Sequence, residues 1–286
     1  METSTTSLPR NRYRAVFLSD THLGTRAARA SELAAFLDVT DTEYLYLVGD
    51  LIDIWALKKT WYWDAAHDQV IRHVLGKGRH GTRVTYVPGN HDEALRDWTP
   101  DHDRSGVLGI SGIALASSAE HVMLDGRRLL VVHGDEFDTV IRFAPWVGHL
   151  GDAAYEVALL LNRWLNAARR RMGFPYWSLA AYLKGKVKLA TVVMGRFEEA
   201  LTRHARDRGM DGVVCGHIHV PAFRVTPSGT LYLNDGDWVE SRSALVEHLD
   251  GALELLVFGE AGYPIASLGR SEARAPVASA QTTNAG

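Results

Sequence analysis

The sequence predicts an α/β fold, and two observations carry this prediction. Short apolar runs rich in β-branched residues alternate with segments of helical periodicity, which is typical of βαβ units and of a sheet buried on both faces. After Pro221 the pattern changes to closely spaced strands, which indicates some antiparallel pairing. The 286 residues are 46% hydrophobic and 23% charged, as expected of a globular protein with a sizeable core.

Five apolar runs are predicted as strands because they are short and bounded by turn residues. They cover residues 15–20, 44–50, 83–90, 129–135 and 212–217. Helical spacing between the first two runs rests on Leu33, Ala34 and Leu37. Between the second and third runs, the helical positions are His67, Val70, Ile71, Val74 and Leu75, and Gly76 and Gly78 end the pattern.

A basic helical segment interrupts the alternation. Residues 142–208 carry 12 Lys/Arg and 5 Asp/Glu, a net charge of +7, so the rest of the chain carries −10. One apolar stripe there consists of Ala154, Val157, Leu161, Trp164 and Leu165, and a second helix is predicted from Leu179, Tyr182, Leu183 and Val187. We therefore predict one domain over residues 12–268 with an inserted helical lid at about 142–208, and flexible termini at 1–11 and 269–286.

Composition excludes several classes of protein. The net charge of −3 argues against a dedicated nucleic-acid binder, so we expect no nucleic-acid partner. The single cysteine, Cys215, cannot form a disulfide within the chain. The first 20 residues lack the apolar core of a signal peptide, and no apolar run approaches the roughly 20 residues needed to span a bilayer. We expect a cytoplasmic location.

Every predicted strand ends in a polar cluster. The clusters are Asp20-Thr21-His22, Gly49-Asp50, Gly89-Asn90-His91-Asp92, His133-Gly134-Asp135 and Gly216-His217-Ile218-His219. Ligands of open α/β sheets bind at the carboxyl ends of the strands, and five of the 13 histidines fall at these ends. Carboxylate, imidazole and amide oxygen donors suit Mn²⁺, Fe²⁺ or Zn²⁺, whereas the absence of thiolates argues against a structural zinc.

These donors predict a site for two divalent ions. Such ions lie roughly 3.5–4 Å apart and need a shared ligand, for which we assign Asp50. One ion is assigned to Asp20, His22 and His219, and the other to Asn90, His133 and His217. We also expect Asp135 to brace His133, as carboxylates do for many metal-bound imidazoles.

The motifs "SDTHLG", "VGDLID", "PGNHDE", "VHGD" and "CGHIHVP", in this order over residues 15–219, resemble those of the calcineurin-like metallophosphoesterases. The resemblance implies a β-sandwich flanked by helices and hydrolysis by metal-activated water. It also implies the same metal ligands as assigned above, residue by residue. It also implies that His91 contacts the phosphoryl group and stabilises or protonates the leaving group. Asp92 is then expected to orient the imidazole of His91.

The 83 residues between His133 and His217 resemble, in placement, the lid of the UDP-2,3-diacylglucosamine pyrophosphatase group. "GDLIDIW" and "CGHIHVPA" are further likenesses. This resemblance implies cleavage of a nucleotide-diphosphate lipid to a lipid monophosphate and UMP, with Mn²⁺ as the first choice of metal. It also implies peripheral contact of the lid with anionic lipid at the inner face of the cell membrane. The best-known enzymes of the group have arginine where His91 stands.

Other interpretations remain open from the sequence. A soluble phosphodiesterase or phosphomonoesterase acting on nucleotides or other phosphoesters would use the same metal ligands. A non-catalytic scaffold should have lost ligands, and all seven are present. The lid could be a helical hairpin whose apolar stripe is only a packing face. The aromatic cluster of Trp55, Trp61, Tyr62 and Trp63 is interpreted as core or lid packing rather than as a stacking surface.

Overall fold

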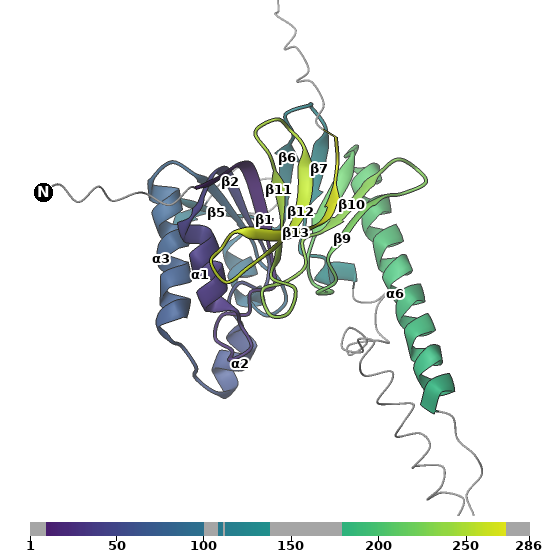
Figure 1. Cartoon of the computed structure of the whole chain (residues 1–286), viewed down its shortest axis with the longest axis horizontal. Helices are drawn as coiled ribbons and strands as arrows, with labels where there is room; N and C mark the ends of the chain where they lie inside the picture. The colour runs from purple at the N-terminus through teal and green to yellow at the C-terminus, as the bar shows by residue number, and fades with distance from the viewer. Residues whose placement is uncertain (1–9, 100–107, 111, 138–178, 273–286) are drawn as a thin grey trace, which may run out of the picture. The chain divides into compact units, whose positions relative to one another are not determined.

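The computed structural model of the chain describes residues 10–99, 108–110, 112–137 and 179–272 (Figure 1). The chain divides into two compact units, residues 1–135 with 202–286, and residues 136–201. The first unit contains both β-sheets. The long helix α6 (Leu179–Asp207) begins in the second unit, and its start at Leu179 agrees with the helix predicted from that position.

Two sheets form the framework of the first unit. The eight-stranded sheet has, in spatial order, β13 (Pro264–Arg270), β12 (Leu253–Phe258), β11 (Ser243–Glu247), β1 (Asn11–Leu18), β2 (Thr40–Val48), β3 (Arg83–Val87), β5 (Ile113–Leu115) and β4 (Leu108–Ile110). The five-stranded sheet has β6 (Ala119–Val122), β7 (Arg128–Val131), β8 (Gly212–Cys215), β10 (Leu231–Asn234) and β9 (Ala222–Val225).

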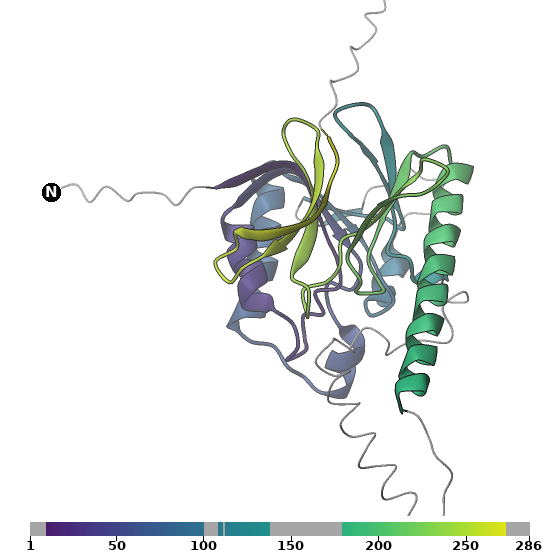
Figure 2. The same cartoon turned by 45° about the vertical axis from the view of Figure 1, so that its right-hand side comes forward.

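Helices cover one face of the larger sheet. The helices α1 (Ala30–Asp38) and α3 (Ala65–Arg79) lie side by side on that face in both views (Figure 1, Figure 2). The short helix α2 (Ile54–Lys59) follows β2, and two 3₁₀ turns, η1 (Glu93–Trp98) and η2 (Asp135–Phe137), follow β3 and β7. Asp64 caps α3 by accepting hydrogen bonds from the main-chain N–H groups of Ala66 and His67.

The apolar strands are buried on both faces, as predicted. Val16 and Leu18 of β1 belong to the core under α1 and α3. Their neighbours Ala15 and Phe17 belong to a second core, which contains side chains of β7, β8 and β10. Because successive side chains of a strand point to opposite faces, an uninterrupted apolar run serves both cores. The predicted α/β sandwich flanked by helices is confirmed.

The structure changes some predicted details. The five predicted strands are present, but they are divided between the two sheets: β1, β2 and β3 in the larger sheet, and β7 and β8 in the smaller. The strands after Pro221 are divided as well, because β10 pairs in parallel with β8 whereas β11, β12 and β13 pair antiparallel in the larger sheet.

Parts of the predicted architecture lie outside the described residues. The stripe from Ala154 to Leu165 is among them, so the lid at 142–208 is described only from residue 179 and remains a prediction. Of the predicted termini, residues 1–9 and 273–286 are likewise outside, whereas β1 begins at Asn11 and β13 ends at Arg270.

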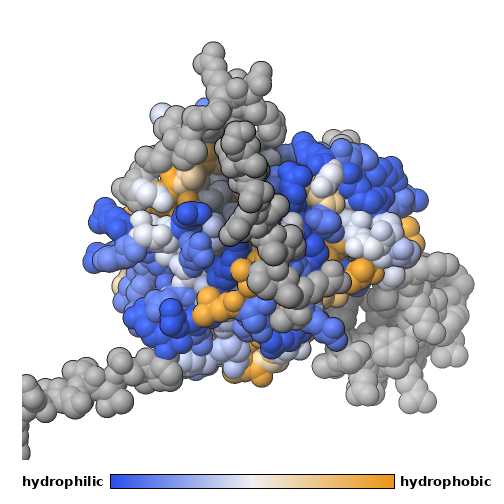
Figure 3. All heavy atoms as spheres, turned by 90° about the horizontal axis from the view of Figure 1, so that it is seen from above, coloured by the Kyte–Doolittle hydropathy of each residue, from blue (hydrophilic) through white to orange (hydrophobic). Residues whose placement is uncertain are grey.

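The face in Figure 3 is mainly hydrophilic, and its hydrophobic residues lie in separate patches. None of the helices in the described ranges is both long and apolar enough to cross a membrane.

Candidate metal centre

The polar loops that follow β1 and β2 lie together because these strands are parallel neighbours. The main-chain N–H of Asp20 donates to the carbonyl oxygen of Gly49 at 3.1 Å, and that of His22 donates to Asp50 at 2.9 Å. In the smaller sheet, β7 and β8 are also parallel neighbours, and Gly216 donates to the carbonyl oxygen of His133 at 3.2 Å. The backbone therefore brings the strand ends together in pairs.

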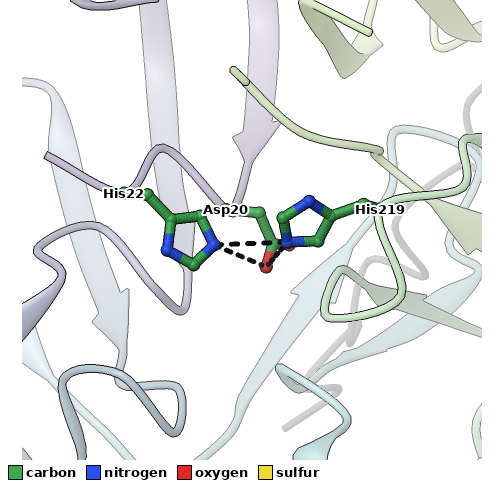
Figure 4. Close-up of side chains that lie close together, drawn as sticks. All are labelled: Asp20, His22 and His219. Carbon is green, nitrogen blue, oxygen red and sulfur yellow. Dashed lines mark hydrogen bonds and ion pairs between the residues drawn. The ribbon is translucent and has the colours of Figure 1, made fainter. Parts of the chain in front are cut away.

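Asp20, His22 and His219 form the first group of convergent donors (Figure 4). Each residue offers one ligand atom, and these atoms lie within 4.8 Å of one another. Nε2 of His22 lies 3.2 Å from Nε2 of His219, which itself lies 3.1 Å from Oδ1 of Asp20. Two imidazole nitrogens and a carboxylate oxygen directed at one point suit a divalent ion.

Asp50, His133 and His217 form the second group, with the same spacing limit of 4.8 Å. Oδ2 of Asp50 lies 3.4 Å from Nε2 of His133 and 3.9 Å from Nε2 of His22. The carboxylate of Asp50 thus lies between a residue of each group, where a bridging ligand would have to lie. The assignment of Asp50 as the bridge remains a prediction.

Hydrogen bonds fix which imidazole nitrogens face the site. Nδ1 of His22 lies 3.1 Å from Oδ2 of Asp53, and Nδ1 of His133 lies 2.8 Å from the carbonyl oxygen of Val48. Since a carbonyl oxygen can only accept a hydrogen bond, neutral His133 carries its proton on Nδ1. Its Nε2 then has the lone pair that can bind a metal. Both rings are thereby oriented with Nε2 available to a metal.

Several candidate ligand atoms are buried without a hydrogen-bond partner among the described residues. They are Oδ1 of Asp20, Oδ1 of Asn90 and Nε2 of His133, since the contacts of Asp20 with His219 and of His133 with Asp50 are ion-pair distances without hydrogen-bond geometry. Buried polar atoms normally have partners, so unpartnered ones require an explanation. Divalent ions would coordinate all three, and the residues present therefore fit the metal pair that their donor types suggest.

The backbone at the site adopts an uncommon conformation. Among the described residues, six non-glycine residues have positive φ, and five of them are candidate ligands. These five are Asp20 (50°), His22 (47°), Asp50 (53°), His217 (69°) and His219 (53°). Positive φ is unfavourable for residues with a Cβ and tends to cluster at functional sites. The turns that place these side chains in the site are therefore unfavourable in local conformational energy.

Glycines allow the buried ligands to approach the main chain. A Cβ on Gly89 would overlap Oδ1 of Asp50 and the imidazole of His133, and one on Gly49 would also overlap His133. Gly49 has φ of +84°, which also favours glycine. Glycine at both positions therefore permits the close approach of these ligands.

The clustered charges shift the pKa values of the site. Burial alone would raise the pKa of Asp20, but His219, His133 and His22 hold it well below its ordinary value. Burial alone would lower the pKa of His133, but Asp50 and Asp20 raise it to about 10. Burial alone would also lower the pKa of His219, but Asp20, as its main partner, raises it to about 9. The buried carboxylates thus attract positive charge to this site.

His91 contacts Asp53 rather than Asp92, which corrects the expected arrangement. Nδ1 of His91 lies 3.0 Å from Oδ2 of Asp53, an ion-pair distance. Asp92 is buried and accepts hydrogen bonds from the main-chain N–H groups of Gly89 and Leu51 at 2.6 and 2.8 Å, and from the hydroxyl of Tyr86. Asp92 therefore holds the loops after β2 and β3 in place, while Asp53 orients the imidazole.

Asp53 is the functional candidate that the sequence interpretation missed. Its Oδ2 contacts His22 and His91. Its Oδ1 accepts a hydrogen bond from the main-chain N–H of Ala56 at 2.7 Å and so caps α2. Although burial opposes ionisation, these contacts keep the pKa of Asp53 below its ordinary value. In the sequence, Asp53 could have been recognised by its position three residues after Asp50 and directly before a helix.

Asp135 does not brace His133. Its carboxylate accepts from Nη2 of Arg96 at 2.7 and 2.8 Å, and the carbonyl oxygen of Val48 takes the expected place beside His133. Asp135 therefore joins η2 to η1. The position of Asp135 in the sequence, two residues after the candidate ligand His133, had suggested that it braces that imidazole.

Comparison with known proteins identifies a family and several similar proteins. A family model described as calcineurin-like phosphoesterase matches residues 13–221. The chain is 26% identical over 258 residues to a UDP-2,3-diacylglucosamine hydrolase of Xanthomonas campestris pv. campestris, covering 84% of this chain and 98% of the relative. It is 26% identical over 247 residues to a protein of the same name from Azotobacter vinelandii, covering 83% and 95%. Among solved structures, it is similar to Vacuolar Protein Sorting 29 of Cryptosporidium parvum, with a TM-score of 0.40, 13% identity, and coverage of 90% and 93%.

Proposed function

The chain belongs to the calcineurin-like phosphoesterase family, and on that premise we propose that it hydrolyses the diphosphate of UDP-2,3-diacylglucosamine to a lipid monophosphate and UMP. Its general activity is metal-dependent hydrolysis of phosphoesters. The observation that supports a hydrolytic site most directly is the convergence of carboxylate and imidazole donors from separate strand ends. The similarity to the two named hydrolases over most of their length supports the lipid substrate.

The metal pair is part of the proposal. Asp20, His22 and His219 would hold one ion; Asn90, His133 and His217 would hold the other; and Asp50 would be shared. We propose Mn²⁺, with Fe²⁺ or Zn²⁺ as alternatives that use the same donors. Bound there, the ions would neutralise phosphate oxygens and lower the pKa of the attacking water.

His91 is proposed as the group that serves the leaving oxygen. Its Nδ1 lies at ion-pair distance from Asp53, so Nε2 is the nitrogen proposed to donate a proton. Burial favours the neutral imidazole, but the nearby carboxylates of Asp53 and Asp50 raise the pKa of His91, which favours the protonated acid. Asp53 remains ionised beside it and stabilises the imidazolium.

A second candidate function deserves a test because of His91 itself. The lipid enzymes that the lid resembles have arginine at this position. A soluble phosphodiesterase or phosphomonoesterase acting on nucleotides or other phosphoesters would use the same ligands with histidine. A non-catalytic scaffold is less well supported, since all seven candidate ligands are present.

The proposed substrate also implies a place in the cell. We propose that the chain acts on this lipid in the cytoplasm, at the inner face of the membrane. The positive charge of residues 142–208 supports contact with anionic lipid.

The deciding experiment uses metal-free protein to which Mn²⁺ is restored. Hydrolysis of UDP-2,3-diacylglucosamine in detergent is compared with that of bis-p-nitrophenyl phosphate, and His91→Ala serves as the control. Release of UMP far above turnover of the generic diester would support the lipid substrate. Turnover of the generic diester without lipid cleavage would refute the lipid substrate and favour the second candidate.

A further inference from the structure

Trp55 is exposed beside the proposed catalytic histidine. Of the aromatic cluster interpreted as packing, Trp63 does pack against the core under α1 and α3. Trp55 and Trp61 instead keep exposed fractions of 39% and 75%. Packing in the core is therefore excluded for these two residues, whereas packing against the lid at 142–208, described only from residue 179, stays a prediction. Large exposed aromatic side chains next to a site are typical of ligand-contacting surfaces.

The structure holds Trp55 against His91 by several contacts. The two ring centroids are 4.4 Å apart, with an angle of 37° between the planes. The main-chain N–H of Ile54 donates to the carbonyl oxygen of His91 at 3.2 Å, which attaches the first residue of α2 to His91. The indole N–H of Trp55 also lies 3.4 Å from Oε1 of Glu93. Asp53, which caps α2, contacts Nδ1 of His91 as well.

The environment of His91 limits where a leaving group can lie. Nδ1 is occupied by Asp53, and the ring of His22 meets His91 edge-on, with centroids 4.6 Å apart and planes at 89°. The ring of Trp55 also lies next to the imidazole. Because the rings of Trp55 and His91 are in contact, a leaving group whose oxygen takes a proton from Nε2 lies within reach of the exposed indole.

We propose that Trp55 contacts an apolar part of the leaving group and so makes the site selective for phosphoesters whose leaving group carries an aryl or acyl surface. The inference rests on the proposed role of His91 and deepens the proposed function. An indole offers a rigid apolar face at little cost in conformational entropy. A hydrophilic leaving group of the same charge would gain nothing from that face.

The test uses three phosphonates that share one head group and resist hydrolysis. Methyl-, phenyl- and octylphosphonate are titrated calorimetrically into the Mn²⁺-loaded protein, with the octyl compound kept below its micelle concentration. The wild type should bind phenyl- or octylphosphonate at least about tenfold more tightly than methylphosphonate, the scale of one aromatic stack. Preference for the phenyl compound indicates an aryl group, and preference for the octyl compound an acyl chain.

Matched variants separate recognition from structural support. Trp55→Ala should reduce the preference to about threefold or less and leave the dissociation constant of methylphosphonate unchanged. Trp55→Phe should recover most of the preference, and Trp61→Ala, which alters an equally large but more exposed side chain, should behave like the wild type. A wild type without preference, or a Trp55→Ala protein that keeps it, would overturn the proposal. Because no hydrolysis is measured, the result does not depend on whether UDP-2,3-diacylglucosamine is the substrate.

Discussion

Oδ2 of Asp53 lies 3.0 Å from Nδ1 of His91, so a carboxylate outside the proposed set of metal ligands is placed to orient the proposed catalytic imidazole. The same oxygen lies 3.1 Å from Nδ1 of His22. One side chain thus orients both a candidate ligand and a candidate acid. Carboxylates in such positions raise the basicity of the imidazoles they contact and keep their rings from turning.

Asp53→Asn should lower kcat by about 10- to 100-fold, the usual cost of losing such a partner. Asparagine caps helices about as well as aspartate does, so the free energy of unfolding should change by less than about 1 kcal/mol. Steady-state kinetics and urea unfolding check both expectations. Asp64→Asn is the matched control, because Asp64 caps α3 in the same manner. An Asp53→Asn protein with the kcat of the wild type would refute the orienting role.

His91→Ala should slow hydrolysis by an amount that depends on the leaving group. A general acid contributes about 10²- to 10⁴-fold, and most when the leaving group is a poor one. We therefore expect a much larger loss of kcat with phenyl esters than with p-nitrophenyl esters, whose phenolate leaves readily without a proton. Equal losses for both esters would show that His91 does not act on the leaving oxygen.

Gly89→Ala should disturb the centre directly, because the added Cβ would overlap Asp50 and His133. We expect a loss of about 1–3 kcal/mol in the free energy of unfolding from this overpacking. We also expect at least about tenfold weaker Mn²⁺ binding, as both ligands would have to move. Calorimetric titration of the metal-free protein measures the affinity.

Gly76→Ala provides the contrast for this prediction. Gly76 lies within α3, and an added Cβ there would meet nothing within 4 Å. That substitution should raise the free energy of unfolding by about 0.5–1 kcal/mol, the helix preference for alanine over glycine. Similar effects of the two substitutions would contradict the account of Gly89.

Glu247 should make stability depend on pH. Its buried carboxylate lies 2.5 Å from Nη1 of Arg14 and 2.7 Å from Nε2 of His121, and it accepts from the main-chain N–H of Leu124 at 2.8 Å. Burial opposes ionisation, but these partners lower the pKa of Glu247 below its ordinary value. A lowered folded-state pKa gives stabilisation that is present above the unfolded pKa of about 4.3 and lost as the pH falls below it.

Glu247→Gln should therefore cost about 3 kcal/mol at pH 7, as breaking a buried ion pair does. The difference from the wild type should narrow as the pH falls from about 5 to 3, which urea unfolding at each pH can follow. Glu120→Gln is the control, since Glu120 and its partner Arg128 are exposed and such pairs contribute at most about 1 kcal/mol. A constant difference at every pH would contradict the prediction.

The general position of the site could be predicted from the sequence because it depends on backbone alone. Parallel strands end at a common edge, so residues directly after Leu18, Val48 and Val87 had to lie near one another. The division into two sheets could not be derived from periodicity, since an apolar run buried on two faces looks the same whichever layer covers it. The resemblance to the family supplied that expectation.

Side-chain directions in the loops were the weakest part of the prediction. Asp92 is adjacent to His91 in sequence, yet it turns inward to Gly89 and Tyr86, while Asp53 arrives from another loop. In a turn, neither period 2 nor period 3.6 governs which way a side chain points. The exposure of Trp55 escaped prediction for a related reason, because α2 has only six residues and too little length for a periodic pattern.

The most direct test of the account is the number of Mn²⁺ ions that the metal-free chain binds, measured by titration calorimetry and by elemental analysis of the loaded protein. Two ions per chain are predicted for the wild type, and fewer for Asp50→Asn, which removes the shared carboxylate. Hydrolysis of bis-p-nitrophenyl phosphate should rise as the second ion binds. A wild type that binds one ion or none, or that is fully active without metal, would contradict the two-metal centre.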